Sequence, residues 1–214
     1  MKFYQILMER GFNRIPSSAH GDLFFDMEED PLYPNGLEYL FGIYYLANQE
    51  EIFKTFWAHD HKEEKIAFSQ FIEFINQHIK LFPDAYIYHY NHYETSALKR
   101  LANRYALAEE ELDNLLNKEK FIDLYVVREG IQVSEPSYSI KNLETFYRGK
   151  RSGEVTNAVD SIVQYNQWRL TQNQKILDDI AKYNKIDCIS TYQLRNWLIS
   201  ISPKEHHQAS LCCL

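Results

Sequence analysis

The chain has 214 residues, of which 45% are hydrophobic and 15% aromatic, and its formal net charge is −7. This length and composition suit one domain with a substantial core, and they exclude global disorder. The negative charge excludes a protein that coats nucleic acid through bulk positive charge. The three cysteines form no CxxC pair, which is typical of a reducing compartment, and no apolar run reaches the roughly 18 residues of a membrane span. We therefore expect a cytoplasmic protein that makes no membrane contact.

The first third of the chain predicts three strands. Residues 1–20 are expected to be a lead-in segment that ends near the breaker "IPSS". The short aromatic run "DLFFDME" at 22–28 predicts the first strand, and the turn "PLYPNG" follows at 31–36. The runs "LEYLFGIYYL" (37–46) and "EIFKTFWA" (51–58) predict a strand pair with a tight connection.

The middle of the chain alternates between helices and strands. An amphipathic helix is predicted over 61–82 by apolar residues at helical spacing: Ile66, Phe71, Phe74, Ile75 and Ile79. "PDAYIYHY" (83–90) predicts a strand, and a helix follows from about Thr95, with Thr95 or Ser96 as its cap. "FIDLYVV" (121–127) predicts a further strand, and the remainder from 137 to 201 reads as helices.

This order of elements predicts a mixed α/β fold, in which an antiparallel meander is continued by crossover-connected strands. It is the order of a ribonuclease-H-like sheet of about five strands flanked by helices, with a helical C-terminal part. Periodicity alone supports only a generic α/β domain. We expect this domain to span 21–200 and to be followed by a flexible tail at 201–214.

The stretch "GDLFFDMEEDP" sets Asp26 and Glu28 two residues apart. Strand side chains alternate between faces, so both carboxylates share one face while Phe25 and Met27 take the other. A carboxylate pair on a core strand suits hard divalent cations, which prefer oxygen ligands. The alternative is an exposed strand end that runs into a turn, because the D-x-E pattern is common.

Two further stretches carry acids on suitable elements. Glu94, in "HYNHYE", lies in the first turn of a helix, where it is either a capping carboxylate or a third ligand beside the first strand. In "YNKIDC", Tyr183 and Asp187 are spaced i, i+4 and share a helical face, which Leu194 and Leu198 continue toward the core. A surface Tyr–Asp contact is the alternative for that pair taken alone.

Taken together, "DME", "HYNHYE" and "YNKID" resemble the three exonuclease motifs of the DEDD superfamily, in its tyrosine-bearing subclass. "GDLFFDMEEDP", "FWAHD", "IYHYNHYETSALKRL", "DLYVVREG" and "LRNWL" further resemble the YprB-type ribonuclease-H-like domain, a predicted RecB-family nuclease. The resemblance runs from about Gly21 to Leu198.

The resemblance implies a 3′–5′ exonuclease that hydrolyses phosphodiester bonds, with single-stranded ends as the expected substrate. Asp26 and Glu28 would be the first two metal ligands, Glu94 the third, where the wider superfamily usually carries Asp, and Asp187 the fourth. Tyr183 would orient the attacking water, since an ordinary phenol pKa of about 10 is too high for a strong base. Four carboxylates favour two Mg²⁺ or Mn²⁺ ions. Because such domains often lie beside a helicase or a second nuclease, we expect such a partner to be encoded separately.

Substrate contacts are less specific in the sequence. His92, Lys99, Arg100 and Lys141 are candidates for binding DNA or RNA, although a solvated surface explains the cations equally well. Tyr90, His92 and Tyr93 are candidates for base stacking, with core packing as the alternative.

His89 and Asp123 are candidates for supporting the acids, and a structural hydrogen-bond acceptor is an equal alternative for Asp123. Two rival functions stay open: a catalytically idle nucleic-acid-binding or scaffold domain, and a phosphodiesterase for short oligonucleotides.

Overall fold

The computed structural model describes residues 3–7, 10–148 and 158–203. The predicted tail therefore lies outside the described residues from position 204 onward.

A five-stranded mixed sheet forms the centre of the fold, in the order β4-β3-β2-β5-β6. β2, β3 and β4 are antiparallel neighbours, whereas β5 runs parallel to β2 and β6 runs parallel to β5. This arrangement confirms the predicted meander with crossover-connected strands. The strands are β2 (Leu23–Asp30), β3 (Leu37–Ala47), β4 (Glu50–Trp57), β5 (Ile87–His89) and β6 (Phe121–Asp123).

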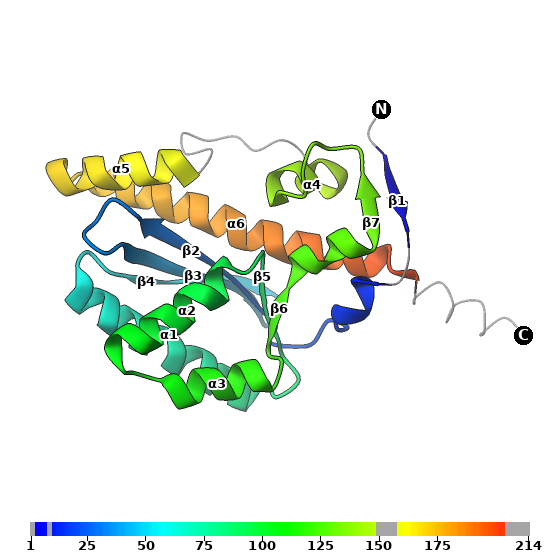
Figure 1. Ribbon diagram of the computed structural model, residues 1–214, viewed down its shortest axis with the longest axis horizontal. Helices are drawn as coiled ribbons and strands as arrows, with labels where there is room; N and C mark the ends of the chain where they lie inside the picture. The colour runs from blue at the N-terminus through cyan, green and yellow to red at the C-terminus, as the bar shows by residue number, and fades with distance from the viewer. Residues whose placement is uncertain (1–2, 8–9, 149–157, 204–214) are drawn as a thin grey trace, which may run out of the picture.

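Helices cover both faces of the sheet (Figure 1). One face packs against the helices in the middle of the chain, which are α1 (His61–Leu81), α2 (Tyr93–Tyr105) and α3 (Glu109–Asn117). The other face is crossed by the long C-terminal helix α6 (Gln174–Ser200). Two shorter helices, α4 (Ile140–Tyr147) and α5 (Ala158–Thr171), pack against α6. The central strands are therefore buried on both faces.

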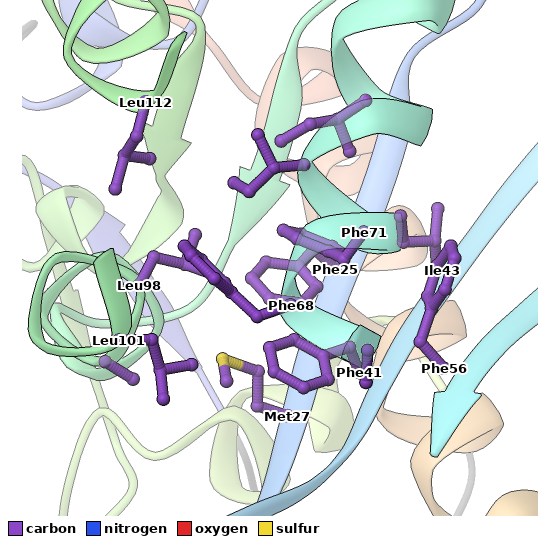
Figure 2. Packing of buried hydrophobic residues seen from close by; sticks show 14 of the residues in the cluster. Phe25, Met27, Phe41, Ile43, Phe56, Phe68, Phe71, Leu98, Leu101 and Leu112 are labelled. Atoms are coloured by element: carbon purple, nitrogen blue, oxygen red, sulfur yellow. The ribbon is translucent and has the colours of Figure 1, made fainter. Parts of the chain in front are cut away.

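The central strand β2 divides its side chains between these two layers. Phe25 and Met27 belong to the core beneath α1 and α2, where Figure 2 shows them packed with Phe68 and Phe71. Phe24 belongs to the opposite core, together with residues of α6. By strand alternation, Asp26 and Glu28 lie on the α6 side with Phe24. The shared face predicted for this pair is thus the face that α6 covers.

Several predicted boundaries were wrong. α2 begins at Tyr93 with His92 at its N-cap, so neither Thr95 nor Ser96 caps it. β6 ends at Asp123, because the Asp123 carboxylate accepts from the Tyr125 amide and the chain turns there into the 3₁₀ helix η2 (Leu124–Glu129). Ile66 of α1 is 56% exposed. The buried face of α1 consists instead of Glu64, Ala67, Phe68, Phe71, Ile72, Ile75 and His78.

A second, two-stranded sheet was not predicted. β1 (Tyr4–Ile6), inside the expected lead-in, pairs antiparallel with β7 (Ile131–Val133). The 3₁₀ helix η1 (Phe12–Arg14) follows β1, and its Phe12 is buried in the core on the α6 side. β1 and η1 therefore pack onto the domain.

Candidate active site

Three carboxylates meet between the central strand and the C-terminal helix. Asp26 and Glu28 project from β2, and Asp187 projects from α6. One oxygen atom from each of the three lies within 4.8 Å of the others. We call these residues the three-acid group. Such a cluster of carboxylate oxygens is the donor set that hard divalent cations require.

Gly42 allows α6 to approach the sheet at this point. It lies directly opposite Asp26 in the β2–β3 ladder. A Cβ atom at position 42 would lie 1.7 Å from Oδ1 of Asn184, so any side chain there would displace the Asn184 amide. The absence of a side chain at Gly42 thus gives Asn184 its place against the strand.

Neutral donors hold the two acids of β2. The Asn184 amide Nδ2 donates to Asp26 Oδ2 at 2.8 Å and to Glu28 Oε1 at 3.5 Å. Ser161 of α5 donates to Glu28 Oε2 at 2.8 Å, and its Oγ lies 2.5 Å from the Tyr39 hydroxyl. Because Ser161 uses its own proton on Glu28, Tyr39 donates to Ser161. Asn184 and Ser161 are both fully buried, so these contacts fix the carboxylates without adding positive charge.

The electrostatics of Glu28 reflect this environment. Burial, and then the nearby Asp187 carboxylate, raise the pKa of Glu28 from 4.5 to about 8. Ser161, Asn184 and Lys141 act in the opposite direction but do not cancel the effect. Burial thus disfavours the charged form of Glu28, and a divalent cation among the three carboxylates would fit their oxygen donors and favour their charged forms.

Tyr183 and Lys141 line a pocket beside the three-acid group. The pocket has a volume of about 240 Å³ and is bordered by Asp26 and Asp187. The Lys141 ammonium donates to the Tyr183 hydroxyl at 3.1 Å. Burial, followed by the three neighbouring carboxylates, raises the pKa of Tyr183 above its usual value. Tyr183 is therefore a neutral phenol at physiological pH.

Glu94 lies outside the three-acid group. It is buried in the first turn of α2, with Oε2 3.5 Å from Nδ1 of His89. That His89 nitrogen donates to the Asn91 carbonyl at 2.7 Å. Burial raises the pKa of Glu94, and His89 opposes this shift. His89 thus contacts Glu94, as expected of a supporting residue.

Asp123 acts as a structural acceptor. Its Oδ1 accepts from the backbone amides of Asn91 at 2.7 Å and Tyr125 at 2.9 Å. Asn91 has a positive φ of 77°, so Asp123 stabilises an unusual turn that leads into Glu94. Of the two alternatives for Asp123, the hydrogen-bond acceptor is the one that these contacts describe.

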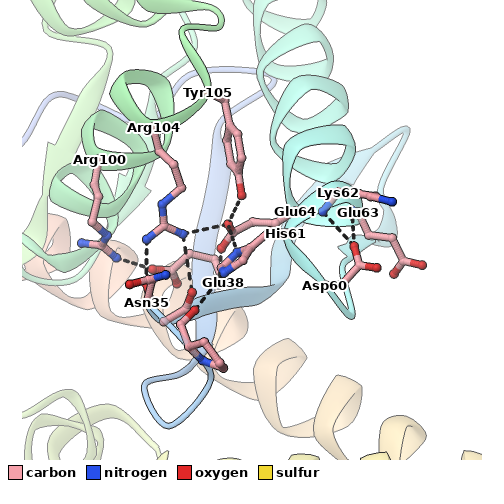
Figure 3. A network of polar contacts seen from close by, with 12 residues as sticks. Asn35, Glu38, Asp60, His61, Lys62, Glu63, Glu64, Arg100, Arg104 and Tyr105 are labelled. Atoms are coloured by element: carbon pink, nitrogen blue, oxygen red, sulfur yellow. Dashed lines mark hydrogen bonds and ion pairs between the residues drawn. The ribbon is translucent and has the colours of Figure 1, made fainter.

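The predicted substrate-binding residues fall in three places. Lys141 lines the pocket at the three-acid group. Arg100 instead pairs with buried Glu38, and Figure 3 shows it beside Arg104 in a separate polar network. His92 and Lys99 are exposed on α2, where the His92 ring contacts the Asn91 side chain.

Sequence reasoning missed Asn184, Ser161 and Gly42. Asn184 carried a signal, because it precedes Asp187 by three residues and lies on the same part of the helix surface. Ser161 carried none, since it reaches Glu28 only through the packing of α5 onto the sheet.

The sheet order, the covering C-terminal helix and the three-acid group define a ribonuclease-H-like α/β domain. A family model described as "RNase_H superfamily" matches residues 23–199, and the chain therefore belongs to the RNase_H superfamily. No curated protein and no solved structure matches the chain significantly. Membership of this superfamily points to nuclease chemistry on nucleic acid. Among the described residues, no helix is both long and apolar enough to span a membrane.

Proposed function

We propose that the protein is a metal-dependent 3′–5′ exonuclease of the DEDD type, in the tyrosine-bearing and YprB-like branch, that acts on single-stranded ends of DNA or RNA. The observation that carries the proposal is the three-acid group, whose oxygen atoms lie within 4.8 Å of one another in an RNase_H superfamily domain. Its position on the central strand and the C-terminal helix fits the motif order that the sequence resembles.

Asp26, Glu28 and Asp187 would hold Mg²⁺ or Mn²⁺, with Glu94 as the fourth acid of a two-cation site. When bound, the cations supply an activated water and offset the charge that develops on the phosphate. Asn184 and Ser161 keep the carboxylates of Asp26 and Glu28 in place, so they are oriented before substrate arrives.

Tyr183 and Lys141 would act on the other side of the pocket. The neutral Tyr183 hydroxyl would orient the attacking water, and the Lys141 ammonium lies 3.1 Å from that hydroxyl. A cation at this position also attracts the phosphate of the bond to be cut. His89 would orient Glu94 through their contact.

Digestion of end-labelled oligonucleotides tests the proposal. Single- and double-stranded DNA and RNA are incubated with Mn²⁺, Mg²⁺ or EDTA. We expect a 5′-labelled single strand to give a ladder of shortened products with either metal and none with EDTA. Cleavage that EDTA leaves unchanged would contradict the proposal.

The same assay separates the two rival functions. Binding without cleavage across all metals and substrates would identify an idle nucleic-acid-binding domain. Cleavage confined to the shortest oligonucleotides would identify an oligonucleotide phosphodiesterase. A helicase or second nuclease as a partner belongs to the same proposal, since these domains often lie beside one.

A further inference from the structure

A groove lined by tyrosines continues from the pocket at the three-acid group. Its volume is about 450 Å³, and the tyrosines that line it are Tyr90, Tyr93, Tyr125 and Tyr138. It shares Tyr90, Ser139 and Ile140 with the pocket that contains Asp26 and Asp187. A strand whose phosphate lies at the acids therefore has a direct path into this tyrosine groove.

Three of the four rings of the groove are held by their own hydroxyl groups. Tyr90 donates to the Tyr138 carbonyl, and Tyr138 donates to the Ile131 carbonyl at 2.7 Å. The Tyr93 hydroxyl donates to Glu29 at 2.5 Å and also lies 3.0 Å from Glu38. These three hydroxyls bond to the protein, so their rings line the groove in fixed orientations. A preorganised aromatic surface of this kind loses little entropy when a flat ligand stacks on it.

Tyr125 is the groove residue best placed to meet a nucleotide. Its ring packs edge-on against Tyr90, with centroids 5.5 Å apart and an interplanar angle of 79°. The Arg128 guanidinium lies 4.6 Å from its centroid, and Arg128 is exposed. Lys141 thus lines the pocket at the three-acid group, and Arg128 lies beside Tyr125, which lines the tyrosine groove.

We infer that the tyrosine groove binds an unpaired nucleotide of the substrate strand by stacking its base on the rings, with Arg128 contacting a phosphate. The inference rests on the proposed function, because it places the strand relative to the three-acid group. Paired bases are already stacked within a duplex, so the groove selects single strands. Ribose and deoxyribose strands share this chemistry.

The test measures binding without cleavage. A short single-stranded oligonucleotide carrying 2-aminopurine is titrated with the full chain in EDTA, in DNA and RNA forms, and a duplex of the same sequence serves for comparison. Stacking quenches 2-aminopurine fluorescence. We expect Tyr125→Ala to weaken single-strand binding by about tenfold or more and to abolish the quenching. Tyr125→Phe keeps the ring and should retain both.

Tyr33 provides a matched control. Its ring also lies under an arginine, with Arg169 4.4 Å from the centroid, but it belongs to the β2–β3 turn and lines neither hollow. Tyr33→Ala should bind and quench like the wild type. Wild-type binding and quenching by folded Tyr125→Ala would overturn the inference, as would equal weakening by both alanine variants.

Failure of the proposed function would give a different pattern. A wild-type protein that quenches the probe but cuts no substrate with Mn²⁺ would contradict the nuclease assignment and leave the groove as a binding site. Metal-dependent cleavage by the wild type, together with unchanged quenching in Tyr125→Ala, would overturn the inference about the tyrosine groove and would support the nuclease proposal.

Discussion

Two groups of acids lie on opposite faces of the β2–β3 part of the sheet, and different side chains hold them. The three-acid group faces α6 and is held by Asn184 and Ser161, which are neutral. On the other face, Glu38 and Glu64 form what we call the arginine-paired acids (Figure 3). Arg100 pairs with Glu38, and Arg104 donates to Glu64 at 3.0 Å. Burial of a carboxylate therefore does not by itself define a metal site, since Glu38 and Glu64 are buried beside arginines.

The pKa values follow this difference. Burial is the largest cause of a raised pKa in both Glu28 and Glu38. For Glu28, Asp187 raises the pKa further, to about 8. For Glu38, Arg100 lowers it, and the pKa is about 7. The arginine-paired acids also hold the β2–β3 turn, since Arg104 donates to the Asn35 carbonyl at 2.7 Å. The arginine-paired acids thus support the fold, whereas the three-acid group gathers three carboxylates at one point.

The largest expected effect comes from breaking the three-acid group. Asp26→Asn and Asp187→Asn each remove a charged ligand, and we expect each to reduce metal-dependent cleavage by more than about a hundredfold. Initial rates with Mn²⁺ measure this. Glu38→Gln is the control from the arginine-paired acids and should cut at the wild-type rate per folded molecule. Full activity in both aspartate variants would contradict the assignment.

Breaking the arginine-paired acids should affect stability instead. Arg104→Ala leaves Glu64, which is fully buried, without its guanidinium. We expect the free energy of unfolding to fall by about 3 kcal/mol, measured by urea denaturation. Arg100→Ala should cost less, because the Arg100 side chain is 45% exposed and Arg104 only 26%. Wild-type stability of Arg104→Ala would show that this group does not support the fold.

Removing or displacing the Asn184 amide should weaken cation binding at the three-acid group. Asn184→Ala removes the amide that joins Asp26 and Glu28, and Gly42→Ala displaces it. We expect Mn²⁺ affinity to fall by about 10- to 100-fold, measured by calorimetry. Asn166→Ala is the matched control, because its amide donates only to a carbonyl of its own helix. An unchanged affinity in folded Asn184→Ala would exclude this positioning role.

The smallest expected effect is a pH dependence of stability. The pKa of Glu28 is about 8 in the folded chain and 4.5 when unperturbed, so between these values the folded chain binds more protons there than the unfolded chain. The free energy of unfolding without metal should therefore fall as the pH rises from 4.5 to about 8. Thermal melts in EDTA measure the slope, which Glu28→Gln should flatten up to about pH 8. Glu38→Gln should flatten it only up to about pH 7. Identical slopes in all three proteins would contradict these shifts.

Local pattern was sufficient to predict much of the fold and part of the site. Strand alternation gave the shared face of Asp26 and Glu28, and helical spacing gave the common face of Tyr183 and Asp187. Both are short-range rules that tertiary packing left intact. The strand order followed from the sequence of elements, because a meander and right-handed crossovers allow few alternatives.

The remainder depends on contacts between distant segments. Arg100 resembles a phosphate-binding residue in sequence, but its partner Glu38 lies 62 positions away. Ser161 reaches Glu28 across 133 positions. The β1–β7 ladder consists of two three-residue strands, which are too short for periodicity to reveal. The sequence predicted which acids share a face, and packing placed arginines beside Glu38 and Glu64.

The most direct test of the central claim is the position of bound manganese in a crystal. Anomalous scattering from crystals soaked in Mn²⁺ locates the ion without reference to activity. The account predicts a peak between Asp26, Glu28 and Asp187 and none at Glu38 and Glu64. A peak at the arginine-paired acids, or no peak at the three-acid group at saturating Mn²⁺, would contradict it.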